Sequence, residues 1–120
     1  MIRIQRVFHR DGLTLTAEGH AGYAPSGQDI VCAGVSALLY GYVAYLEGLS
    51  SIATAEAASE GGGGGCDETH LAVEESDGRL WVRTRGLGGL DLRGFAVTEA
   101  GLRLIAAAYP GYVTYCGGMD

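Results

Sequence analysis

Two reactive side chains, Cys32 and His20, stand at the two ends of a glycine-rich segment. Asp29 occupies the position of a helix N-cap, so Cys32 would fall in the first turn of the helix that follows. The free amides and positive dipole end of a helix N-terminus favour a thiolate, which is the nucleophilic form of cysteine. A histidine within hydrogen-bond reach takes the thiol proton and later donates one to a leaving amine. These residues predict a Cys-His dyad for acyl transfer, with amides of the first turn holding the oxyanion.

Each of these residues also has an ordinary structural role. A cysteine among Val31, Ala33 and Val35 is typical of a small buried hydrophobe, and a histidine after a glycine is typical of a turn. Asp29 would either cap the helix or orient His20 as the acid of a catalytic triad does. Ser36 follows Cys32 by one helical turn and shares its face, where it would bond either the site or its own helix backbone.

Periodicity places these residues within a small set of elements. Apolar and polar residues alternate over residues 2–8, 13–18, 69–75 and 79–85, which predicts strands, and the turn sequences at residues 10–12 and 76–78 join them as two hairpins. Helices are predicted from Asp29 to about Leu46, ended by Gly48, and over residues 95–109, ended by Pro110. Residues 112–116 predict a last strand. This order indicates an α+β fold in which two helices pack on a mostly antiparallel sheet of about five strands, a two-layer sandwich.

The chain of 120 residues suits a single domain spanning residues 1–120, with a flexible glycine-rich loop at about residues 50–66. Residues 30–46 carry no charge and approach the length of a membrane span. Many small residues, the acidic flanks Asp29 and Glu47, and the lack of nearby Lys or Arg favour instead a core or dimer-interface helix covered on both sides. We therefore expect no contact with a membrane.

Composition narrows the classes of protein further. Fourteen acidic and eight basic residues give a net charge of −6, which favours basic partners over nucleic acid. Three cysteines without a CxxC pair exclude a disulfide framework or a four-cysteine zinc site and suit a reducing cytoplasm. Residues 1–8, with Arg3 and Arg6, have the pattern of a strand and not that of a signal peptide.

The segment around the dyad resembles the ribosomal-processing cysteine protease family, Prp (also called YsxB-like). The resemblance rests on Gly19-His20-Ala21, a glycine-containing spacer, and then Gly27-x-Asp29-Ile30-Val31-Cys32-Ala33-x-x-Ser36-Ala37. Residues 101–110, which end in Tyr109-Pro110, are similar to the second helix of that family. The run Gly61–Gly65 with Cys66 looks like an insertion to which we assign no role.

The resemblance implies an α+β sandwich that forms a homodimer and needs no cofactor or metal. It implies an endopeptidase that removes a short N-terminal extension from a large-subunit ribosomal protein. The family's histidine and cysteine correspond to His20 and Cys32, and its supporting aspartate and serine to Asp29 and Ser36. The loop after His20 would close on substrate, with Gly22, Tyr23 and Gly27 as its contacts. Some family members occur where the ribosomal protein lacks a cleavable extension, so the substrate stays open.

Three other functions remain compatible with the sequence. The first is a non-catalytic, ribosome-associated binding module of the same fold. The second is a hydrolase that uses the same dyad on a non-peptide acyl group. The third is a metal site built from His20, Cys32, Cys66 and His70, although its cysteines lack the close spacing of most such sites.

Overall fold

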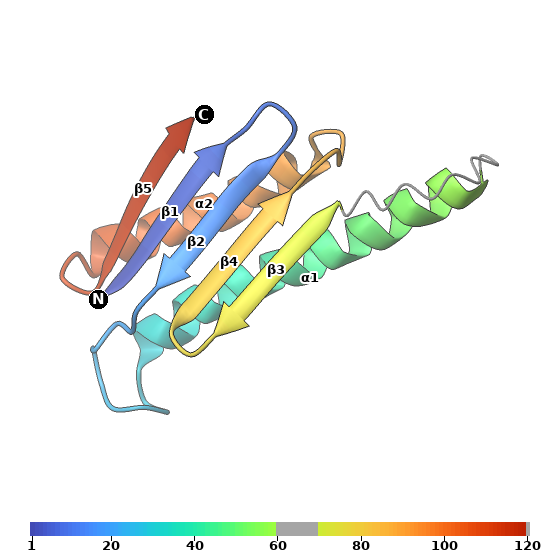
Figure 1. Cartoon of the computed structure of the whole chain (residues 1–120). Helices are drawn as coiled ribbons and strands as arrows, with labels where there is room; N and C mark the ends of the chain where they lie inside the picture. Colours follow the sequence, from blue (N-terminus) through green and yellow to red (C-terminus); the bar gives the residue numbers. More distant parts are fainter. Residues whose placement is uncertain (60–69, 120) are drawn as a thin grey trace.

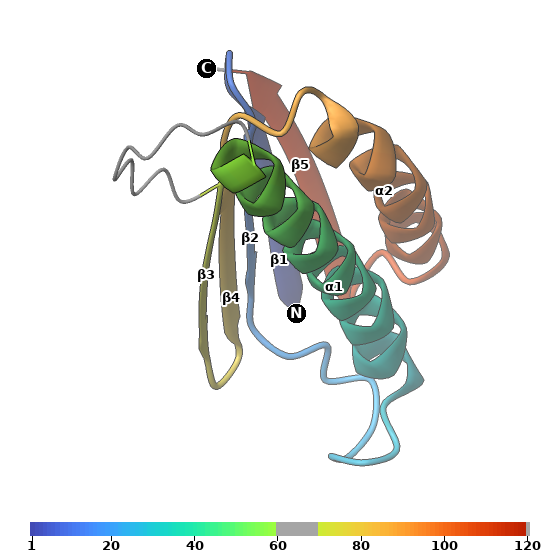
Figure 2. The same ribbon diagram turned by 90° about the vertical axis from the view of Figure 1, so that its right-hand side faces the viewer.

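The computed structural model describes residues 1–59 and 70–119. Within these residues the chain forms β1 (Ile2–Phe8), β2 (Leu13–Glu18), α1 (Ile30–Ser59), β3 (Leu71–Ser76), β4 (Arg79–Thr84), α2 (Leu90–Ala108) and β5 (Val113–Met119). The strands form one sheet in the order β3-β4-β2-β1-β5. Every neighbouring pair is antiparallel except β1 and β5. Both helices cover the same face of this sheet (Figures 1 and 2), which confirms the predicted α+β fold.

β1, β2 and β4 alternate between a face toward the helices and an open face, as the sequence predicts, whereas the edge strand β3 has no buried residue. The buried side chains toward the helices include Ile2, Ile4, Leu13, Leu15, Leu80 and Val82. Both predicted turns join hairpins, β1 to β2 and β3 to β4. The β3–β4 turn lies at the end of the sheet where the chain leaves β2 for α1 (Figure 1). The antiparallel pairing of β2 with β4 therefore brings this turn to the segment that carries His20.

One side of α1 lies on the sheet, and the other side faces solvent. Val31, Val35, Leu39, Tyr42 and Leu46 are buried, at the three- and four-residue spacing of one helical face. The outer side is exposed, so the expectation that both sides are covered was wrong for the isolated chain. By length and composition alone, Ile30–Ile52 could cross a membrane, with a mean hydropathy of 1.5. Its buried face packs as the core helix of a globular fold does.

Three predicted boundaries were wrong. The first helix continues past Gly48 to Ser59, so residues 50–59 of the predicted flexible loop are helical. Residues 60–66 of that loop lie outside the described residues. The second helix begins at Leu90 instead of residue 95, and the last strand continues from Val113 to Met119. β5 extends this far because it pairs along the whole of β1, from Ile2 with Val113 to Phe8 with Met119.

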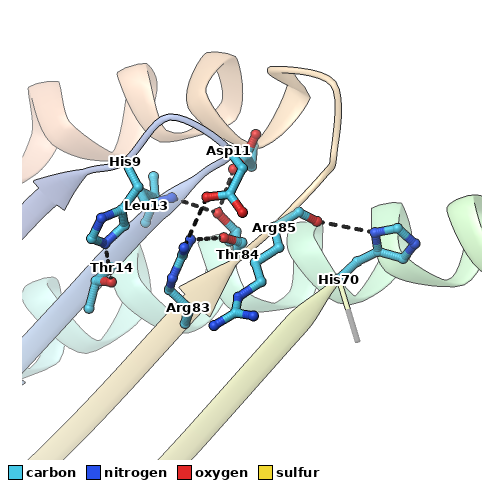
Figure 3. A network of polar contacts seen from close by, with 9 residues as sticks. His9, Asp11, Leu13, Thr14, His70, Arg83, Thr84 and Arg85 are labelled. Atoms are coloured by element: carbon cyan, nitrogen blue, oxygen red, sulfur yellow. Dashed lines mark hydrogen bonds and ion pairs between the residues drawn. The ribbon is translucent and has the colours of Figure 1, made fainter. Parts of the chain in front are cut away.

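A buried polar network joins β2, β4 and α2 at the end of the sheet away from His20 (Figure 3). The hydroxyl of Thr84 donates to Asp91 Oδ2 at 2.5 Å and accepts the backbone N–H of Leu13 at 2.9 Å. Thr84 and Asp91 are 0% and 1% exposed. Arg83 pairs with Asp11 at 2.9 Å beside this network and bonds the Thr84 carbonyl. This network fixes the start of α2 against the sheet.

Candidate active site

Asp29 organises the start of α1 and the loop before it. Its Oδ1 accepts the backbone N–H of Cys32 at 2.9 Å, which is the bond of an N-cap to the third residue of the helix. Its Oδ2 accepts the backbone N–H groups of Tyr23 and Ala24 at 3.0 and 3.4 Å. These amides, led by that of Cys32, hold the pKa of Asp29 below its ordinary value of 3.8. The structural role predicted for Asp29, capping, is the one observed.

A backbone amide from the loop reaches the sulfur of Cys32. The N–H of Ala21 donates to Cys32 Sγ at 3.3 Å. Ala21 is buried and directly follows His20, so this bond holds the histidine segment against the first turn of α1. The amide hydrogen of Ala21 thus points at the sulfur atom.

Two cavities meet at Cys32 and His20, and Ser36 lines both. The smaller, of about 150 Å³, we call the apolar pocket, since its floor is formed by the buried residues Ile2, Ala17, Val35, Leu39 and Leu80. The larger, of about 740 Å³, we call the loop cavity, since most of its lining comes from residues 20–29. A peptide passing over Cys32 would have a space on either side of the scissile bond.

The β3–β4 turn forms the other wall around His20. Nε2 of His20 lies 3.7 Å from Asp77 Oδ1. Gly78 lies against the Nε2 end of the ring, because a Cβ built on Gly78 would stand 2.9 Å from the same Nε2. Asp77 also lines the loop cavity, together with His20 and Cys32.

The predicted site residues are not all placed as expected. The carboxylate of Asp29 accepts backbone N–H groups and so orients the loop and the helix. The carboxylate that pairs with His20 in the described chain is that of Asp77. The N–H of Cys32 bonds Asp29 and that of Ala33 bonds the Asp29 carbonyl, so these first-turn amides are not free for an oxyanion. The amide that points at the sulfur of Cys32 is that of Ala21 instead.

The loop residues divide between the cavity and the protein surface. Gly22 and Gly27 line the loop cavity, and both have positive φ, at 70° and 86°. Tyr23 points elsewhere and packs edge-to-face on Tyr109 and Tyr112, with ring centroids 5.5 and 5.3 Å apart. Tyr23 therefore anchors the loop to the end of α2 instead of lining the cavity.

The predicted metal ligands do not come together among the described residues. No group of three or more His, Cys, Asp or Glu within residues 1–59 and 70–119 is arranged to hold a metal ion. His70 and His20 lie at opposite ends of β3, about 20 Å apart at the rise of a strand. Cys66 lies outside the described residues.

A family model described as cysteine protease Prp matches residues 1–114 of this chain. The chain belongs to the Prp family. A Prp relative from Mycoplasma pneumoniae, named a ribosomal processing cysteine protease, is 30% identical over 115 residues, which are 96% of this chain and 93% of the relative. A second relative of that name, from Mycoplasma genitalium, is 52% identical over 33 residues, covering 28% of this chain and 33% of the relative.

The same architecture occurs in solved structures. The crystal structure of Prp from S. aureus with a covalently linked product peptide has a TM-score of 0.73 to this chain at 20% identity, covering 98% of this chain and 99% of the other. A protein from Streptococcus mutans has a TM-score of 0.65 at 25% identity, covering 100% and 96%. As a member of the Prp family, this protein is a cysteine protease.

Replacing Asp29 with alanine should lower the melting temperature by about 2–8 °C at pH 7, because one change removes a helix cap and a loop anchor. The lowered pKa of Asp29 means that this contribution is present above the unfolded-state value and is lost as pH falls through the folded one. The difference between wild type and Asp29→Ala should therefore shrink only below about pH 4. Thermal melts between pH 7 and pH 2.5 measure it, and a difference that stays constant down to pH 2.5 would contradict this assignment.

Proposed function

We propose that this protein is an endopeptidase that removes a short N-terminal extension from a large-subunit ribosomal protein, with Cys32 as nucleophile and His20 as its base. The bond from Ala21 N–H to Cys32 Sγ carries the proposal, because it holds the residue next to His20 against the sulfur. The two cavities that open on both residues support it further. The relatives named ribosomal processing proteases supply the substrate class.

In this mechanism His20 accepts the proton of Cys32, and the thiolate attacks the scissile carbonyl carbon to form a tetrahedral intermediate. His20 then gives that proton to the leaving amine as the C–N bond breaks, which leaves a thioester on Cys32. A water molecule, deprotonated by His20, hydrolyses the thioester and returns the thiol. Ala21 N–H stabilises the thiolate before the attack.

The cavities suggest how a peptide lies. The apolar pocket would take an apolar side chain next to the scissile bond, since its floor is buried hydrocarbon. The loop cavity would take the peptide on the other side, between residues 20–29 and the β3–β4 turn. Gly22 and Gly27 would allow close approach of a peptide backbone there. The net charge of −6 favours association with basic ribosomal proteins.

Intact mass spectrometry of the host's own large-subunit ribosomal protein tests this proposal directly. The ribosomal protein, with its N-terminal extension, is incubated with wild type and with Cys32→Ser. Loss of a short N-terminal piece with wild type alone supports both the reaction and the nucleophile. An intact ribosomal protein after incubation with a folded wild-type enzyme overturns the substrate, and cleavage by Cys32→Ser overturns the nucleophile.

We also propose that the enzyme works in the cytoplasm as a homodimer joined through the outer face of the helix layer. Leu90, Val97 and Leu104 repeat every seven residues on α2 and are 46%, 77% and 72% exposed, which forms an apolar stripe. Light scattering should give twice the 12.4 kDa mass of one chain. Val97→Glu should shift that mass toward the monomer, and a wild-type monomer at micromolar concentration would contradict the dimer.

A further inference from the structure

The β3–β4 turn lies far from His20 in the sequence but is joined to the segment that carries His20 by contacts between β4 and β2. Glu18 pairs with Arg79 at the end of the β2–β4 ladder, and their side chains form an ion pair at 3.4 Å. One residue further on, Gly19 N–H donates to the Gly78 carbonyl at 2.7 Å. The position of the turn relative to His20 is therefore set by the sheet itself.

Two residues of the turn contact the imidazole ring of His20: Asp77 through its carboxylate and Gly78 through its backbone, which carries no side chain. Asp77 Oδ1 lies 3.7 Å from His20 Nε2, and Gly78, at φ +67°, leaves room for the ring where a Cβ would collide with it. Asp29, the other carboxylate in the loop cavity, accepts three backbone N–H groups. Arg79 is occupied by Glu18. Asp77 is thus the acidic group of the described chain that is placed to act on the ring.

The geometry points to Asp77 as the positioning residue of His20, which acts on the thiol of Cys32 through the imidazole. A carboxylate at Nε2 favours a proton on that nitrogen and leaves Nδ1 to exchange the proton with the thiol. The same negative charge stabilises the imidazolium that forms when Cys32 becomes a thiolate. This inference rests on the Cys32–His20 dyad of the proposed function.

The groups around His20 come from five parts of the chain, and the β3–β4 turn contributes Asp77. The ring shares its cavities with Cys32 and Tyr40 on α1, Asp29 in the loop and Arg79 on β4, and the N-terminal ammonium group of Met1 donates to the His20 carbonyl. Asp77 and His20 are 100% and 67% exposed at the side chain, so solvent and salt screen their interaction. The expected effect is therefore modest and depends on ionic strength.

Alkylation of the full-length protein by iodoacetamide tests the inference without any peptide substrate. Peptide mass mapping separates the rate at Cys32 from that at exposed Cys116, which serves as an internal reference. At low salt and pH 6–7, Asp77→Asn should slow alkylation of Cys32 about threefold, and Asp77→Glu should restore most of the rate. The difference in rate between wild type and Asp77→Asn should vanish above about pH 9, because a thiol ionises there without the help of an imidazolium. In 0.5 M salt the alkylation rate of Cys32 in the wild type should fall toward the rate in Asp77→Asn.

Asp11→Asn is the matched control, since Asp11 is also an ion-paired carboxylate in a hairpin turn, at the other end of the sheet. It should leave the rate at Cys32 unchanged at every pH. If His20→Ala slows alkylation and Asp77→Asn does not, the role of Asp77 is overturned while the dyad stands. If neither slows it, the dyad itself is overturned. If Asp77→Asn lowers the alkylation rate of Cys32 by the same factor at all pH values, the effect is structural and the positioning role is also overturned.

Discussion

Replacing His20 with alanine should lower kcat/KM for peptide cleavage by about two to four orders of magnitude, because the thiol loses its base and the leaving amine loses its acid. Alkylation of Cys32 at pH 7 should slow as well, while that of Cys116 stays constant. Cleavage is measured with a peptide that spans the N-terminal extension, and alkylation by mass mapping. Both measurements report on the same proton acceptor, one with substrate and one without it.

His70→Ala is the matched control for this prediction. His70 bonds the Arg85 carbonyl at 3.1 Å at the opposite end of β3, so its loss should leave both rates unchanged. A His20→Ala variant that keeps wild-type cleavage would exclude His20 as the base. A variant that loses cleavage but alkylates normally would assign His20 to substrate binding or to protonation of the leaving group.

Replacing Thr84 with valine should cost about 3 kcal/mol of unfolding free energy, the largest effect on stability that we expect from a near-isosteric change. The substitution leaves two buried groups, Asp91 Oδ2 and Leu13 N–H, without the hydroxyl that they share. Figure 3 shows Leu13 beside Thr84. For a chain of 120 residues this corresponds to a fall in melting temperature of about 10 °C. Urea denaturation measures the free energy.

Thr16→Val offers the control, since Thr16 lies on β2 but pairs with Trp81 on the open face of the sheet. Its cost should stay within about 0.5 kcal/mol. Because Thr84 is remote from Cys32, folded Thr84→Val should alkylate at the wild-type rate well below its melting temperature. Equal stabilities of Thr84→Val and Thr16→Val would show that the buried network contributes nothing.

The elements were predictable where the signal is local. The alternation of apolar and polar residues predicted the strands of the hairpins, and Asp29 predicted the start of α1, which it caps. The end of α1 was not predictable in this way, because Gly48 inside a helix costs only about 1 kcal/mol. Packing offsets that cost, since Leu46 is buried and Leu49 contacts the core on either side of Gly48. The extent of β5 was missed for a related reason, since it depends on pairing with the distant β1.

The candidate site divides in the same way. Cys32 and His20 belong to one short segment, so their types and spacing suggested the pair, and the resemblance of that segment to the Prp family supported it. Asp77 was identified only as part of a turn, and nothing local says that this turn meets His20. That meeting depends on the pairing of β2 with β4, which joins strands separated by a helix and another strand. The role of Tyr23 was missed because its partners, Tyr109 and Tyr112, lie near the other end of the chain.

The contact of Tyr23 with Tyr109 and Tyr112 has a consequence for the order in which a newly made chain becomes active. Within the part of the chain that the structure describes, the residues that line the two cavities around Cys32 run from Ile2 to Leu80, so they are synthesised before α2 and β5. Tyr109 and Tyr112, which anchor the loop, are synthesised later. At a synthesis rate of about 5–20 residues per second they follow Leu80 by several seconds. Until then the loop lacks the aromatic contacts that hold it. A nascent chain would therefore carry Cys32 and the residues around it before the contacts that fix the loop exist.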